Sequence, residues 1–81
     1  MTDRPDWMRP VDVKILVSFQ RAQPEYIPLV ANRLGIHLSY AERRCDLLSE
    51  HALITSVTEE AVYRVTDQGE ALITEVQQKK S

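Results

Sequence analysis

The chain has 81 residues, a formal net charge of −2 and 43% hydrophobic residues, which leaves room for one domain with a small core. No apolar run reaches the roughly 18 residues that a membrane span needs, and the charged N-terminus lacks the apolar part of a secretion signal, so we expect a cytoplasmic protein with no membrane partner. The single cysteine excludes an internal disulfide, and the slight acidity argues against indiscriminate nucleic-acid binding without excluding a local basic surface.

The first predicted element is a helix that begins near Pro10. Residues 1–6 are polar and charged, and we expect a flexible N-terminus there, with Trp7 as the first residue that has a reason to dock. Pro10 and Asp12 are typical of a first helical turn, because that turn tolerates a missing N–H and places an acid near the positive end of the helix dipole. The inward stripe is Ile15, Leu16 and Phe19, and a second apolar strip is formed by Val13 and Val17.

A helix-turn-helix is predicted by the next two periodic segments. In the connector over 22–25, Pro24 favours extended structure, as does Pro28 after it. Apolar residues then recur at i, i+3, i+4 and i+7. Pro28 suits the first turn of this helix, and Gly35 ends it because a residue without a Cβ adopts the left-handed conformation at little cost. The periodic apolar residues are Ile27, Val30, Ala31 and Leu34.

The second helix of the pair is predicted from Tyr40 to about His51. Ser39 and Glu42 match a capping box, in which two side chains satisfy backbone N–H groups at the start of a helix. Cys45 lies on the apolar stripe, so we interpret it as a small buried hydrophobe rather than a reactive thiol. The stripe consists of Ala41, Cys45 and Leu48.

Two alternating segments and a last helix complete the pattern. Residues 52–57 and 61–65 are rich in β-branched side chains, and the polar link 58–60 joins them, which predicts a hairpin. Thr66 is typical of an N-cap for a final helix that we expect to fray over 79–81. The apolar residues of that helix are Ala71, Leu72, Ile73 and Val76.

A set of residues spread along the chain matches a known pattern in order and spacing: Ala31, Gly35, Ala41, Arg44, Leu48, Leu53, Ile54, Tyr63 and 66–69. With an opening like 6–8 and a helix like 12–19, this pattern resembles the winged helix-turn-helix of small archaeal transcription regulators, in particular haloarchaeal repressor-like proteins. The resemblance implies one α+β winged-helix domain over 7–78, ordered helix, helix, helix, β-hairpin, helix. It also implies an archaeal source and a DNA-binding repressor.

The outward face of the second helix is the candidate DNA-binding surface of such a fold. At about 100° per residue, the side opposite the buried stripe carries Ser39 and Arg43. Arg43 can reach guanine O6 and N7 in a bidentate contact, and Arg44 beside it is expected on phosphate. The predicted DNA-binding set is His37, Ser39, Tyr40, Arg43 and Arg44, with Arg64 on the hairpin.

An alternative interpretation keeps this face free of DNA. Intrahelical ion pairs would make it an ordinary solvated surface, and the pairs would be Arg43 with Glu50 and Arg44 with Glu42. The hairpin link carries Glu59 and Glu60, which repel phosphate, so that Arg64 alone supplies a suitable charge there. The rival function is therefore a winged-helix protein–protein interaction module without DNA binding.

We expect no catalytic residue, metal or cofactor, and therefore no enzyme. His37, Cys45 and His51 come nearest to a metal-ligand set, but the chain has no Cys-x-x-Cys or His-x-x-x-His spacing. The two glycines, Gly35 and Gly69, do not form a phosphate-binding loop.

A homodimer is expected from the amount of apolar surface. Val13 and Val17 on the first helix, with Leu72 and Val76 on the last, exceed what so small a domain is expected to enclose, which favours a symmetric contact between these helices. Two recognition helices would then lie about 34 Å apart on successive turns of a duplex. The expected partners are double-stranded DNA and a second copy of the chain.

Overall fold

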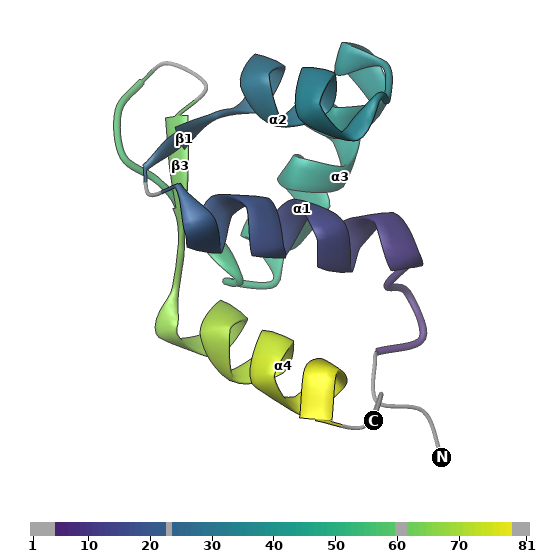
Figure 1. The fold of residues 1–81 in the computed structure, drawn as a ribbon. Coiled ribbons are helices and arrows are strands. Elements are labelled where there is room, and N and C mark those ends of the chain that lie inside the picture. The colour runs from purple at the N-terminus through teal and green to yellow at the C-terminus, as the bar shows by residue number, and fades with distance from the viewer. Residues whose placement is uncertain (1–4, 23, 60–61, 79–81) are drawn as a thin grey trace.

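The computed structural model describes residues 5–22, 24–59 and 62–78 (Figure 1). In chain order the elements are α1 (Pro10–Arg21), β1 (Glu25–Tyr26), α2 (Ile27–Leu34), α3 (Leu38–Glu50), β2 (Ile54–Ser56), β3 (Val62–Val65) and α4 (Asp67–Gln78). This order confirms the predicted α+β arrangement, and the connector forms the short strand β1. Predictions for residues 1–4, 23, 60–61 and 79–81 lie outside the described residues.

Helix α1 runs through the middle of the molecule, with α4 on one side and the α2–α3 pair on the other (Figure 1). The sheet has the order β1-β3-β2 with both pairings antiparallel, so the last strand in sequence is the central one. Glu25 lies opposite Tyr63, and Ile54 opposite Val65. The core forms where the helices meet this sheet, and its largest fully buried side chains include Phe19, Ile15, Leu16, Leu48, Ile54 and Ile73.

The start of α1 confirms the prediction from the sequence. Pro10 is the first residue of the helix, and the Asp12 carboxylate accepts a hydrogen bond from the Arg9 N–H at 2.9 Å. Met8 is buried, and its N–H donates to the Pro5 carbonyl at 3.0 Å. The segment before α1 is therefore anchored, and the acid satisfies a backbone group that the helix leaves open.

The end of α2 also follows the prediction. Gly35 has a φ of 70°, in the left-handed region that glycine adopts without a Cβ clash. The Ile36 N–H then donates to the Ala31 carbonyl at 3.0 Å, which closes the helix end. Ala31 on α2 and Ala41 on α3 are both buried, as the close approach of two helices joined by so short a turn requires.

Helix α3 begins earlier than predicted, and the expected capping box does not form. His37 rather than Ser39 is the N-cap, and its carbonyl accepts a hydrogen bond from the Ala41 N–H at 2.9 Å. Ser39 is thus already inside the first turn, where its hydroxyl cannot reach the N–H groups that an N-cap side chain serves, and no side chain among the described residues caps this end. The helix ends at Glu50, with His51 as its C-cap.

The hairpin starts later than predicted, while the cap of α4 is confirmed. Ala52 has a φ of 62° and turns the chain after α3, so that β2 begins only at Ile54. The Thr66 hydroxyl accepts a hydrogen bond from the Gly69 N–H at 3.1 Å and donates to the Ala52 carbonyl at 2.6 Å. A Cβ at Gly69 would clash with the Leu53 carbonyl, so this glycine allows α4 to approach the backbone beside the hairpin.

The predicted surplus of apolar surface is smaller in the structure. Val76 is only 8% exposed and is buried within a single chain, whereas Val13, Val17 and Leu72 are partly buried against the core. The reason is that α4 lies beside α1, so each helix covers part of the other's apolar stripe (Figure 1). Val76 is thus covered without a second copy, and the predicted dimer contact would have to use the apolar surface of Val13, Val17 and Leu72.

Candidate nucleic-acid interface

Helix α3 turns a polar face away from the core. Ser39 and Arg43 are exposed and Tyr40 is partly exposed, while the buried side of the helix is Ala41, Cys45 and Leu48. The helical period of 3.6 residues places these two sets on opposite sides. The face that the sequence indicates for DNA is thus open to solvent.

Arg43 is free to bind a partner. Its guanidinium carbon lies 5.9 Å from the centroid of the Tyr40 ring, within the range of a cation–π interaction. Among the described residues it forms no ion pair, so the alternative pairing of Arg43 with Glu50 is not present. The aromatic ring one turn earlier restrains the side chain without neutralising its charge.

Arg44 points the other way, into the protein. Its Nε donates to Asp12 Oδ1 at 2.8 Å, a second nitrogen donates to the other carboxylate oxygen, and that nitrogen also lies 3.3 Å from the Trp7 carbonyl. The Arg44 side chain is 13% exposed and that of Asp12 is 0% exposed. The pair therefore joins the middle of α3 to the start of α1.

Arg44 was predicted to contact phosphate, but in the structure its guanidinium is engaged by Asp12. A buried carboxylate is unfavourable unless a cation and hydrogen bonds compensate it, and Arg44 supplies both to Asp12. The hydrogen bond to Asp12 raises the pKa of Arg44 more than burial lowers it, so the guanidinium stays charged and engaged. The alternative pairing of Arg44 with Glu42 is likewise replaced by this longer-range link.

A second polar link was not indicated by the sequence. Arg33 on α2 donates to Glu25 Oε2 at 2.7 Å and also to the Ser18 hydroxyl on α1. Burial acts to raise the pKa of Glu25, but the hydrogen bonds from Arg33 and the Tyr26 N–H, with the charge of Arg33, outweigh it and lower the pKa. Arg33 thereby ties α2 to both α1 and β1.

The remaining candidate residues are exposed at two edges of the helix-turn-helix. His37 lies in the turn before α3, and Arg64 lies on β3 opposite Thr55. Glu59 is exposed in the hairpin link and keeps the acidic character that the sequence predicts, whereas Glu60 lies outside the described residues.

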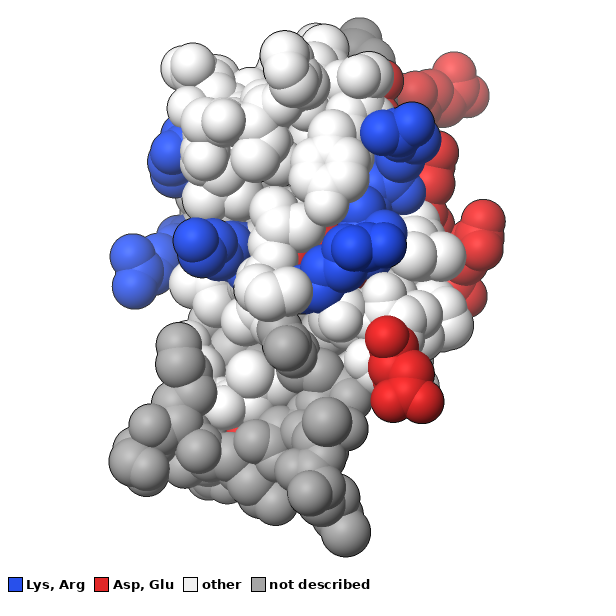
Figure 2. All heavy atoms as spheres, turned by 90° about the vertical axis from the view of Figure 1, so that its right-hand side faces the viewer, with Lys and Arg blue, Asp and Glu red and all other residues white. Residues whose placement is uncertain are grey.

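The charges are segregated on one face of the molecule. Figure 2 looks at the right-hand side of the view in Figure 1, where Lys and Arg form a band across the middle while Asp and Glu lie along one edge. The net charge of −2 therefore does not describe this face, and local charge rather than the sum governs the approach of an anionic partner.

Cys45 and the acidic residues do not form a reactive site in the described part of the chain. Burial, with the neighbouring charges of Asp46, Asp12 and Glu42, raises the pKa of the Cys45 thiol to about 12. A protonated thiol is neither a nucleophile nor a metal ligand. The described residues also contain no group of three or more His, Cys, Asp or Glu side chains placed to hold a metal ion, and none of their helices is long and apolar enough to cross a membrane.

Comparison with known proteins gives structural matches without sequence matches. No protein-family model and no curated protein matches the chain. Among solved structures, the multiple antibiotic-resistance repressor MarR from Listeria monocytogenes superposes with a TM-score of 0.83 at 15% identity, covering 88% of this chain and 51% of that one. The transcriptional repressor CouR gives a TM-score of 0.81 at 18% identity, with coverages of 89% and 53%.

A third match, Staphylococcus aureus MarR in complex with salicylate and kanamycin, gives a TM-score of 0.79 at 22% identity, covering 90% of this chain and 52% of that one. These likenesses confirm the winged helix-turn-helix fold. The chain spans about half the length of each of these proteins, so the comparison concerns the part of them that shares this fold.

Proposed function

We propose that this chain is a sequence-specific double-stranded DNA-binding transcription regulator that acts as a repressor in the cytoplasm. The observation that carries the proposal is the exposed start of α3, the second helix of a helix-turn-helix, where the Arg43 guanidinium forms no ion pair among the described residues. In such folds this helix enters the major groove. Two of the solved proteins that share the fold are repressors by name, which agrees with a role other than catalysis.

Each exposed residue has a role that its chemistry fits. Arg43, held beside the Tyr40 ring, contacts guanine O6 and N7. Ser39 and His37 are near the start of α3, where backbone N–H groups and the helix dipole also favour phosphate. Arg64 on the hairpin contacts the backbone of the adjoining groove. Arg44 is left out of this set because Asp12 already occupies its guanidinium.

The proposed regulator acts as a homodimer on a palindromic site and belongs with the small archaeal regulators that its sequence resembles. Val13, Val17 and Leu72 retain some exposure and offer apolar surface for a two-fold contact. Sedimentation of the unmodified protein at tens of micromolar tests the dimer directly. A protein that remains monomeric there contradicts the dimer and leaves a reader of a single half-site.

The DNA-binding proposal is tested with a labelled random-sequence duplex titrated at several salt concentrations. A groove-binding protein loses affinity steeply with salt, since each neutralised phosphate adds about 0.9 to the slope of log K against log salt. Arg43→Ala is compared with Lys14→Ala, which removes an exposed charge from α1 instead. Affinity that is low and independent of salt contradicts the proposal.

One observation favours a second candidate, a winged-helix protein–protein interaction module. Glu59 is exposed in the hairpin link, and Arg44 is neutralised by Asp12, so fewer cations remain for a duplex than the sequence indicates. That function predicts the flat salt response described above. It also predicts that Arg43→Ala and Lys14→Ala leave duplex binding equally unchanged.

A further inference from the structure

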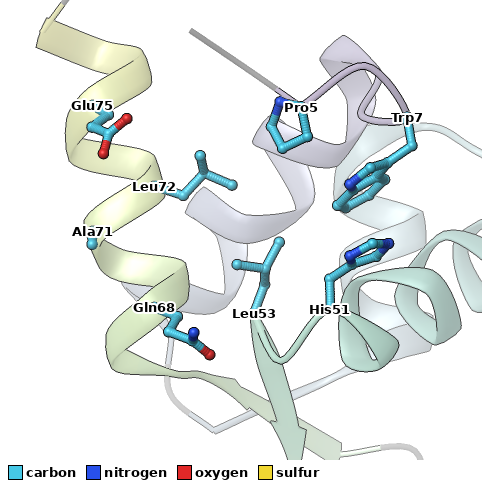
Figure 3. A pocket seen from close by; sticks show the side chains of 8 residues that line it. All are labelled: Pro5, Trp7, His51, Leu53, Gln68, Ala71, Leu72 and Glu75. Carbon is cyan, nitrogen blue, oxygen red and sulfur yellow. The ribbon is translucent and has the colours of Figure 1, made fainter.

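A pocket of about 350 Å³ lies apart from the exposed residues of α3, between α4, the segment before α1 and the chain that follows α3 (Figure 3). Ligand pockets in proteins start at about this size. The proposed DNA contacts use none of its lining residues. It is therefore a candidate site separate from the proposed DNA contacts, and of its lining residues only Leu72 also belongs to the proposed dimer contact.

One wall of the pocket is a stacked pair of rings. The ring centroids of Trp7 and His51 are 4.1 Å apart, and the planes differ by 10°. The backbone at both positions is held by hydrogen bonds, since the Trp7 carbonyl accepts from Arg44 and the His51 N–H donates to the Leu47 carbonyl at 3.1 Å, and the stacking restrains the two rings against each other. The ring pair is stacked in the structure, and a wall already in place limits the ordering cost of binding.

The rest of the pocket joins an apolar base to a polar rim on α4. Leu72 on α4 points toward Leu53, and Gln68, Ala71 and Glu75 line the pocket along α4 (Figure 3). Gln68, Leu72 and Glu75 recur at helical spacing, which places them on one side of α4. Neither Lys nor Arg is found among the described lining residues, and Glu75 is the one carboxylate there.

We propose that this pocket binds a small hydrophobic amine. Its apolar body lies against Leu53, Leu72 and the ring pair, and its ammonium group pairs with the Glu75 carboxylate, while the Gln68 side-chain carbonyl is available as a second acceptor. The charge of Glu75 sets the sign of the ligand, because it attracts a cation and repels a carboxylate of the same shape. The site binds its ligand without DNA.

The test uses three probes that share one hydrophobic body and differ in charge: phenylpropylamine, phenylpropanol and phenylpropionate. Trp7 is the single tryptophan of the chain, so its fluorescence reports on the wall of the pocket. In mildly alkaline buffer without DNA, the amine is expected to bind roughly two- to fivefold more tightly than the alcohol, as a partly exposed ion pair allows. The carboxylate is expected to bind most weakly.

Variants on α4 separate the pocket from general surface binding. Glu75→Gln is expected to abolish the preference for the amine, whereas Glu70→Gln, an exposed residue of the same helix outside the pocket, should leave it intact. Ala71→Phe places a large ring at an exposed lining position and should weaken all three probes, with circular dichroism confirming that the variant is folded. Equal binding of the three probes, or a preference that survives Glu75→Gln, overturns the proposal.

A second measurement covers the case in which a ligand binds without changing the fluorescence of Trp7. Amide chemical shifts are expected to move at Leu53, Leu72 and Glu75 when phenylpropylamine is added, and absence of both shifts and fluorescence change overturns the proposal. Since no duplex is present, failure here leaves the DNA-binding function standing. A flat salt response with duplex DNA, conversely, leaves the amine site standing.

Discussion

The two ends of the molecule are held to α1 by different forces. At the helix-turn-helix end, charged side chains reach across: Arg44 on α3 binds Asp12, and Arg33 on α2 binds Glu25 and Ser18. At the other end, α4 is held by steric fit, with Gly69 against the Leu53 carbonyl and buried apolar residues along the helix. Charged pairs with buried carboxylates fix the angle of the helix that is proposed to read DNA, whereas α4 is held by close packing together with the neutral hydrogen bond from the Thr66 hydroxyl to the Ala52 carbonyl.

The largest loss of stability is expected when the buried pair of Arg44 and Asp12 is broken. Arg44→Ala leaves the fully buried Asp12 carboxylate without its cation, and breaking such a pair costs about 3–5 kcal/mol. Urea denaturation measures the free energy of unfolding directly. A loss below about 1 kcal/mol would mean that Asp12 finds another partner or takes up a proton, and that charge does not fix this end.

The packed end is tested with Gly69→Ala. The new methyl group would clash with the Leu53 carbonyl and the Val65 side chain, and overpacking of this kind costs about 1–3 kcal/mol. Thermal unfolding followed by circular dichroism reports the loss. The matched control is Gly35→Ala, where the added Cβ meets no atom within 4 Å but φ is 70°, so the strain there comes from the backbone alone. An unchanged melting temperature in Gly69→Ala would contradict the steric account.

Arg43→Ala tests whether the exposed arginine of α3, unlike its neighbour Arg44, acts in DNA binding rather than in stability. Arg43 is exposed, so its removal should change stability by less than about 0.5 kcal/mol. The same change should weaken specific DNA binding by about 1–3 kcal/mol if Arg43 contacts a base edge. Anisotropy titrations with a selected and a random duplex distinguish a base contact from a phosphate contact. An equal loss of affinity for both duplexes would assign Arg43 to phosphate.

The smallest effect on stability is expected from the ion pair of Glu25 with Arg33. Its folded pKa is lowered below the ordinary 4.5, so its stabilisation is present above that value and is lost as the pH falls through the folded pKa. Since the Arg33 side chain is 49% exposed, the contribution should stay below about 1 kcal/mol. Glu25→Gln should reduce the loss of stability between neutral and acidic pH, and an identical pH profile would assign that loss to other carboxylates.

The features that the sequence predicts well are local ones. Pro28 and Gly35 delimit α2, and Thr66 caps α4, because each conformation depends on neighbours within a few residues. The capping box predicted at Ser39 does not form although its pattern is also local, since α3 begins at Leu38 with His37 as its N-cap. Ser39→Ala is accordingly expected to have little effect on stability.

The pairing of Asp12 with Arg44 was missed because the two residues are far apart in sequence. A signal was nevertheless present. Arg44 follows Ala41 by three residues and precedes Leu48 by four, so helical spacing places it on the buried side. Asp12 precedes Ile15 by three residues and Leu16 by four, so it also lies on a buried stripe. Opposite charges on two buried stripes indicate a partnership, although which stripes meet depends on the packing.

The order of strands in the sheet has a consequence for the growing chain on the ribosome. The central strand β3 is synthesised last, so β1 and β2 have no partner until Val62 and the residues after it have emerged. A nascent chain that ends before β3 is therefore expected to contain α2 and α3 without a sheet to hold them. Hydrogen exchange on such a truncated chain should show an unprotected amide at Glu25, which lies opposite Tyr63 in the complete sheet, and protection there would show that β1 is ordered without β3.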